Sequence, residues 1–242
     1  MQNGFFGEFM GTMVLILLGN GVVANVLLKK SKGEGSGWMV IATGWALAVM
    51  AGVFTAIACG SEGHLNPAVT LAAAVTSGDF SKVVPYMAAQ IAGALTGACL
   101  VWLHYLNHWR VTPEADLKRA CFCTAPAIRS PLANLLSEVI GTFALVLVAD
   151  AIFSKSVGGT AGLATGLGPW LVGSVVWGIG LGLGGPTGYA INPARDLGPR
   201  IAHAILPIPD KEGSDWGYAA IPIAGPLLGG TVAGLLVRMI HF

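Results

Sequence analysis

Six long apolar stretches constrain this chain more than any other feature of its sequence. A helix needs about 20 apolar residues to cross the hydrocarbon core of a lipid bilayer. Charged residues make up only 10% of the chain, against roughly 25% in soluble domains. The sequence therefore predicts an all-α membrane protein with six transmembrane helices, near residues 5–28, 38–58, 83–106, 133–154, 166–183 and 217–240.

The chain also repeats itself. The segment GEFMGT (7–12) resembles SEVIGT (137–142), and HLNPAV (64–69) resembles AINPAR (190–195). Each half holds three of the long stretches, and an odd number of spans inverts the second half relative to the first. In such inverted repeats, short interrupted helices meet near the bilayer midplane and form the functional site. We therefore predict a single channel domain, 1–242, with inverted repeats at about 1–106 and 131–242 joined by the loop 107–130.

Two shorter apolar stretches, near 66–77 and 193–204, are too short to span the bilayer. Each starts at an Asn-Pro-Ala sequence. Asn is a favoured N-cap residue, and Pro is favoured at the first helical position, so each stretch is predicted to be a re-entrant half-helix. Inversion brings the two N-termini face to face at a central constriction made by Asn66, Pro67, Ala68, Asn192, Pro193 and Ala194.

This constriction has specific physical consequences. Each helix N-terminus carries about half a positive charge, which opposes cations, including hydronium. The Asn amides offer N–H donors to a passing oxygen. Non-helical backbone at this depth is tolerated where it lines a wet cavity or is buried in protein. Such a path suits water or a polyol and rejects ions, and we expect acceptor carbonyls along one wall from Gly63, His64, Leu65, Gly188 and Ala190.

Two acids and several tryptophans lie at notable places in the apolar stretches. Glu8 and Glu138 lie inside such stretches, where acids are functional suspects. We expect each to accept hydrogen bonds from backbone amides of the nearby re-entrant loop and so to support that loop. Trp38 and Trp109 lie near span ends, which is typical of anchors at the membrane interface.

The sequence argues against several other classes of protein. The formal net charge is +1 and there is no long basic run, so we expect no nucleic-acid partner. There is no metal-spaced His/Cys cluster and no nucleophile–base motif, so we expect no enzyme, cofactor or metal. The N-terminus lacks a basic region before its apolar stretch, so we expect no cleavable signal peptide. An ion-coupled secondary transporter, which also uses inverted repeats, remains the alternative from a different class.

With its two Asn-Pro-Ala segments and its GEFMGT start, the chain resembles the major intrinsic protein (aquaporin) family, and most of all bacterial glycerol uptake facilitators. The resemblance covers nearly the whole length. It implies six tilted helices and two half-helices, one pore per subunit, a homotetramer, and residence in the plasma membrane. It also implies that both termini are cytoplasmic, whereas the lysines at 29, 30 and 32 would place the N-terminus outside by the positive-inside rule.

The resemblance also implies a selectivity filter on one side of the Asn pair. Arg195 follows the second Asn-Pro-Ala, Tyr189 takes an aromatic position, and Gly180 stands where water-only channels have His. Trp45 is the candidate aromatic on the second helix, although its spacing from Asn66 leaves Ala46 as an alternative. Arg195 would then donate to hydroxyls, while the two aromatics form an apolar corner for the carbon edge of a polyol.

The resemblance implies a passive channel for glycerol and similar small uncharged solutes, with water. Gly180 argues against a water-only pore, because it leaves room that a His would fill. The residues do not decide among glycerol, dihydroxyacetone, urea, neutral lactic acid and water. Glu62 replaces a usual small residue near the inner mouth, where it either favours cations locally or faces solvent.

Overall fold

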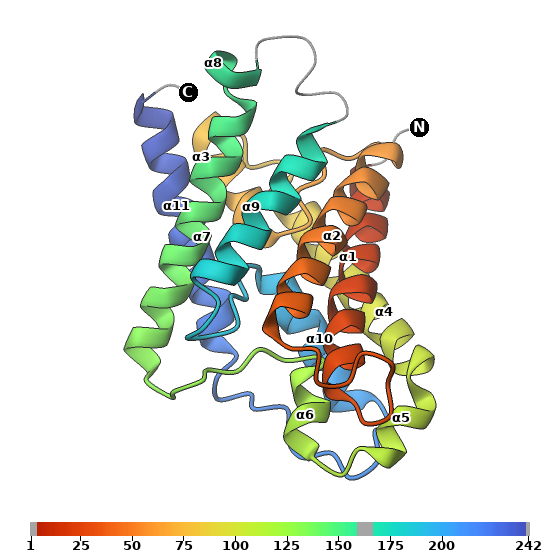
Figure 1. Ribbon diagram of the computed structural model, residues 1–242. Helices are drawn as coiled ribbons and strands as arrows, with labels where there is room; N and C mark the ends of the chain where they lie inside the picture. Colours follow the sequence, from red (N-terminus) through yellow and green to blue (C-terminus); the bar gives the residue numbers. More distant parts are fainter. Residues whose placement is uncertain (1–3, 159–166, 241–242) are drawn as a thin grey trace.

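The computed structural model describes residues 4–158 and 167–240, and within those ranges its regular secondary structure is entirely helical (Figure 1). This confirms the predicted all-α fold. Five helices are long and apolar enough to cross a membrane. These are α1 (Gly4–Leu27), α2 (Trp38–Ala58), α4 (Val83–His104), α7 (Pro131–Phe153) and α11 (Ala220–Ile240).

The sixth predicted span is shorter than expected. We predicted 166–183, and the structure has α9 at Gly168–Gly182, which is 15 residues. At 1.5 Å per residue this helix is about 22 Å long, less than the roughly 30 Å of a bilayer's hydrocarbon core. Residue 166 of the prediction lies outside the described residues. The helix packs against α2 and α7 and so belongs to the same layer of helices.

Both short apolar stretches are half-helices, as predicted. They are α3 (Pro67–Ser77) and α10 (Pro193–Ile205), and each has an Asn N-cap with extended backbone followed by Pro at the first helical position. Figure 1 shows α3 in the upper half of the bundle and α10 in the lower half. Their N-termini therefore face each other near the middle of the bundle.

The connection 107–130, which we predicted as a loop, holds two short helices. They are α5 (Leu106–Val111) and α6 (Ala115–Ala120), and a further short helix, α8 (Lys155–Gly158), follows α7. Trp109, predicted to anchor at the membrane interface, is instead 1% exposed. Its indole donates to the carbonyl of Trp102 and its ring lies 5.5 Å from that of Phe122. The hydrogen bond to Trp102 of α4 holds the connection against the end of the bundle, opposite the end where α1 begins and α11 finishes (Figure 1).

Helix packing relies on glycines at the closest crossings. α1 packs on α2 and α4, and α7 packs on α11. Each half-helix contacts a long helix of the other half of the chain, α3 on α11 and α10 on α4. A Cβ at Gly97 of α4 would lie 2.5 Å from the carbonyl oxygen of Met13, and one at Gly229 of α11 would overlap the carbonyl of Val139. Close backbone contact of this kind holds membrane helices together.

We expect Gly97→Ala to destabilise the protein by about 1–3 kcal/mol, the usual penalty for overpacking a filled site. The matched control is Gly178→Ala in α9, where a Cβ would meet nothing within 4 Å. Because Ala favours helix over Gly by up to about 1 kcal/mol, the control should keep or raise stability. Thermal unfolding of both variants in detergent measures the difference. Equal melting temperatures would show that the α1–α4 crossing tolerates a methyl group.

Candidate functional site

Two Asn side chains join the re-entrant segments at the centre of the molecule. Asn66 Nδ2 donates to the carbonyl of Ile191 at 2.8 Å, and Asn192 Nδ2 donates to the carbonyl of Leu65 at 2.9 Å. Each amide therefore bonds to the segment before the other half-helix. The reciprocal pair holds the two helix starts together, which is the arrangement that the inverted repeat predicts.

The same amides cap their own helices. Asn66 Oδ1 accepts from the N–H of Ala68 at 2.9 Å. Asn192 Oδ1 accepts from the N–H groups of Ala194 at 3.0 Å and Arg195 at 3.2 Å. Ala68 and Ala194 are fully buried. An Asn amide nitrogen carries two N–H groups, so each Asn keeps one donor beyond the bond that joins the loops.

Unusual backbone conformations precede each Asn. Leu65 has φ 54°, Tyr189 has φ 39° and Ile191 has φ 43°, alongside left-handed Gly63 and Gly188. A non-glycine residue in this region costs of the order of 1–3 kcal/mol and persists only where its surroundings enforce it. Among the described residues, these strained positions flank both Asn N-caps. The other described non-glycine residues with positive φ, Lys30, Asp210 and Asp215, lie in connections away from this site.

Two buried carboxylates enforce that backbone. Glu8 is 0% exposed and accepts from the N–H groups of His64 at 2.9 Å and Leu65 at 2.7 Å, from Gln90 Nε2 at 2.7 Å, and from the Ser61 hydroxyl. The sequence predicts this role for Glu8, which accepts hydrogen bonds from backbone amides of the nearby re-entrant loop.

Glu138 makes the equivalent contacts in the second half. It is 1% exposed and accepts from the N–H groups of Ala190 at 3.0 Å and Ile191 at 2.8 Å. The N–H and C=O of a trans peptide point in opposite directions. The carbonyls of Tyr189 and Ala190 therefore point away from Glu138. By the same geometry the carbonyls of Gly63 and His64 point away from Glu8.

One predicted acceptor differs from expectation. The carbonyl of Leu65, which we expected along the wall, accepts the amide of Asn192. The Tyr189 carbonyl belongs to the peptide whose N–H, that of Ala190, donates to Glu138, so it points away from that carboxylate. Gly63, His64, Leu65, Gly188 and Ala190 all line the central cavity.

The predicted filter residues of α2 and α10 meet in that cavity. Arg195 Cζ lies 4.1 Å from the centroid of the Trp45 ring, within the range of a cation–π contact. Arg195 Nη1 and the Tyr189 hydroxyl have no hydrogen-bond partner among the described residues. Trp45, Tyr189 and Arg195 all line the cavity, whereas Ala46 does not. The alternative register at Ala46 is therefore not the one in the structure.

Gly180 acts on the cavity indirectly, through Tyr189. It does not itself line the central cavity. A Cβ at this position would lie 2.8 Å from Tyr189 Cζ. Its carbonyl accepts from the Trp38 indole at 2.9 Å, and Trp38 meets Tyr189 edge to face at 5.7 Å. Trp38, predicted as an interface anchor, is thus also a support for the filter aromatic.

The central cavity measures about 370 Å³ and contacts both Asn residues. A second cavity of about 320 Å³ is lined by Trp38, by the segment 125–127 and by three glycines. Gly188 lines both cavities, so they adjoin next to Tyr189. A path of this kind past Arg195 is what a channel requires.

The opposite mouth of the central cavity carries two carboxylates, Glu62 and Asp150. Glu62 pairs with Lys82 Nζ at 2.5 Å and lies 3.5 Å from His64 Nε2, and its side chain is 52% exposed. Sequence reasoning missed Asp150 because it ends an apolar stretch and matches no motif. Of the two readings of Glu62, the exposed ion pair favours the one in which it faces solvent.

Comparisons with known proteins agree with this geometry. A family model described as "Major intrinsic protein" matches residues 1–237. A probable glycerol uptake facilitator protein from Thermotoga maritima is 55% identical over 233 residues, which are 96% of this chain and 97% of that protein. The glycerol uptake facilitator protein of Streptococcus pneumoniae is 50% identical over 240 residues, 99% of this chain and 100% of that protein.

A solved structure is similar over the whole fold. The aquaglyceroporin from Plasmodium falciparum superimposes with a TM-score of 0.85 at 30% sequence identity. The match covers 98% of this chain and 95% of that one. The arrangement of long helices and half-helices is therefore shared with a channel-forming protein.

We expect Glu138→Gln to lower stability by about 1–3 kcal/mol, because one of the two backbone N–H groups would then face an amide NH₂ instead of an acceptor. Unfolding in detergent, followed by tryptophan fluorescence, measures the loss. The control is Glu62→Gln, which changes an exposed carboxylate on the equivalent loop and should have little effect. If both variants melt together, the Glu138 bonds do not hold the loop.

Proposed function

The chain belongs to the major intrinsic protein family, and we propose that it forms a passive channel for glycerol and similar small uncharged solutes. The observation that carries this proposal is the meeting of two Asn amides, Arg195 and the filter aromatics on one continuous cavity. The names of the Thermotoga and Streptococcus relatives support glycerol as the solute.

The filter fits a molecule with one polar and one apolar edge. Arg195 lines the cavity and has a planar fork of donors suited to hydroxyl groups. Trp45 and Tyr189 present aromatic surface to C–H groups. Beyond the filter, the remaining N–H of each Asn supplies a hydrogen-bond donor. The backbone carbonyls along the wall supply acceptors for the solute's hydroxyl groups. A polyol therefore exchanges hydrogen bonds as it moves, without losing them.

Positive potential along the path supports exclusion of cations and protons. The N-termini of α3 and α10 each contribute about half a positive charge at the centre, and Arg195 adds a full charge at the filter. At the other mouth, the Asp150 carboxylate lies in the cavity wall and opposes anions. Water is small enough to follow the same path and satisfies the same donors and acceptors.

We further propose that the chain is one channel domain of two inverted repeats, about 1–106 and 131–242, and that it assembles as a homotetramer in the plasma membrane. The repeated roles of Glu8 and Glu138, and of Asn66 and Asn192, support the repeat. The tetramer rests on the family resemblance alone.

Stopped-flow light scattering on proteoliposomes tests the function. We expect glycerol flux well above that of empty vesicles, a low activation energy, and no dependence on a sodium or proton gradient. Water, urea and lactic acid at low and neutral pH give the substrate range. A requirement for an ion gradient would indicate a coupled transporter, and absence of glycerol flux in the presence of water flux would indicate a water channel.

Gly180→His should lower glycerol permeability about tenfold or more while water flux is retained. The added side chain meets Tyr189, which lines the cavity, and so narrows the passage beside it. A rise of about 1.4 kcal/mol in the barrier to glycerol is a factor of ten in rate. The control is Gly178→His, two residues earlier on α9, where a Cβ meets nothing within 4 Å. Glycerol flux that is equal in both variants would remove Gly180 from the filter.

A further inference from the structure

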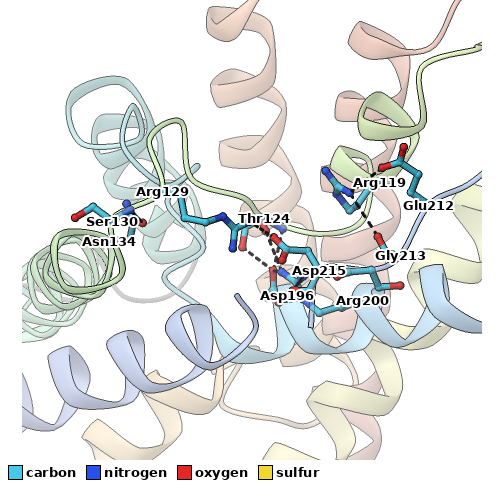
Figure 2. A network of polar contacts seen from close by, with 11 residues as sticks. Arg119, Thr124, Arg129, Ser130, Asn134, Asp196, Arg200, Glu212, Gly213 and Asp215 are labelled. Carbon is cyan, nitrogen blue, oxygen red and sulfur yellow. Dashed lines mark hydrogen bonds and ion pairs between the residues drawn. The ribbon is translucent and has the colours of Figure 1, made fainter. Parts of the chain in front are cut away.

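Arg200 is the centre of a buried polar network on the outer side of α10 (Figure 2). Its guanidinium is 0% exposed and uses all five of its N–H donors. Two go to the Asp196 carboxylate, from Nε at 2.6 Å and Nη2 at 2.8 Å. The others go to the carbonyls of Ser214 at 2.5 Å, Asp215 at 3.0 Å and Thr124 at 2.9 Å. One side chain thus ties α10 to two separate connections of the chain.

Thr124 forms hydrogen bonds with both members of the Asp196–Arg200 pair. Its N–H and its hydroxyl donate to Asp196 Oδ1 at 2.8 and 2.6 Å, and its carbonyl accepts from Arg200. Asp196 is 0% exposed and Thr124 is 6% exposed. Every hydrogen-bonding group of Thr124 is therefore fixed on the Asp196–Arg200 pair, and with it the position of the chain that follows.

The residues that follow Thr124 form the wall of the outer cavity. Ala125, Pro126 and Ala127 line it together with Trp38 and Gly188. The N–H of Ala127 donates to the carbonyl of Pro186 at 3.0 Å. This segment, 124–127, thus stands directly outside the filter.

An outer layer of contacts reinforces the network from the solvent side. Arg129 pairs with the Asp215 carboxylate at 2.5 Å (Figure 2). Its guanidinium also lies over the Tyr218 ring, 5.5 Å from the ring centroid. Arg129 is charged at all ordinary pH values, and its hydrogen bond to Asp215 raises its pKa further. The 206–219 connection is thereby attached to 121–130 at a second point.

We propose that Arg200 is a positioning residue that, through Asp196 and Thr124, fixes segment 124–127 as the outer wall of the passage and so limits the size of solute that reaches Arg195. The inference rests on the proposed function. Buried ion pairs are often no more stabilising than well-packed apolar residues of similar volume. Every partner of the Asp196–Arg200 pair lies on α10 or in the two outer connections. The pair is therefore better explained by the positions that it gives to those connections than by a gain in stability.

Two mild variants test this inference, because removing Arg200 altogether would leave Asp196 buried without its cation. Thr124→Val deletes only the hydroxyl bond to Asp196, and Arg200→Lys keeps the charge but cannot make five bonds. Thr124→Ser keeps the hydroxyl and is the matched control. The readout is the ratio of erythritol to glycerol permeability in proteoliposomes, which does not depend on the amount of folded protein.

We expect the ratio of erythritol to glycerol permeability to rise about threefold in Thr124→Val and in Arg200→Lys. A hydrogen bond to a charged group can change an equilibrium roughly tenfold, and the expected effect is smaller than that. Thr124→Ser should match the wild type. A ratio unchanged in both test variants would overturn the inference while leaving the glycerol channel intact. A wild type without glycerol flux would instead overturn the proposed function.

A second readout does not depend on transport. Cys123 precedes Thr124 and is 3% exposed, and burial raises the pKa of its thiol to about 12, so it should react slowly with a maleimide. With Cys59, Cys99 and Cys121 replaced by Ala, labelling reports on this segment alone. We expect Thr124→Val to speed labelling severalfold relative to Thr124→Ser. Equal labelling rates would overturn the positioning role, whatever the permeability ratios.

Discussion

The rest of this structure depends on satisfying irregular backbone in the middle of a bilayer. Lipid offers no partner for a peptide N–H, and each unpaired group costs several kcal/mol. Glu8 and Glu138 take up the N–H groups before each half-helix, and the two Asn residues take up one carbonyl on each side. Because the N–H groups face the carboxylates, the remaining carbonyls face the cavity. The row of carbonyls along the cavity is thus a consequence of the backbone N–H groups donating to the two glutamates.

A second consequence concerns charge. Arg195 is followed directly by Asp196, which could neutralise it. The structure instead pairs Asp196 with Arg200 at 2.6 Å and also gives it both donors of Thr124. Among the described residues Arg195 has no ion pair, and it rests on the face of Trp45. Its charge is therefore directed at the passage. The Asp196 carboxylate thus forms its ion pair with Arg200 and not with its neighbour Arg195.

The sequence was sufficient for the parts of the fold that repeat. Asn-Pro-Ala and the buried glutamates each occur twice, so a single pattern predicted the half-helices and the bonds that hold their loops. A contact that occurs only once, between residues far apart in the sequence, has no repeated pattern from which it could be predicted. The Trp38 indole reaches the carbonyl of Gly180, 142 residues away, and no local pattern indicates it.

The charge pattern and the family resemblance predict opposite orientations, and several of the lysines behind the charge pattern have partners in the structure. Lys29 counts as a positive residue in the sequence, but in the structure it lies near Glu34 at 3.4 Å and Glu114 at 3.8 Å. Lys118 is fully buried and donates to the carbonyl of Pro209. Counting basic residues treats these as free charges facing the membrane surface. Lys82, on the opposite side, is also paired, with Glu62 at 2.5 Å, so ion pairing occurs at both ends of the bundle.

Passage through such a site also requires weak binding. A solute must enter each position and leave it again, so no single position can hold it tightly. Each Asn has already committed its oxygen and one N–H to protein, which leaves one donor per residue for the solute. The wall carbonyls are spaced along the backbone and accept one at a time. The protein's own hydrogen bonds thus limit how strongly any point of the passage can bind, and a solute that trades one bond for the next meets no deep minimum.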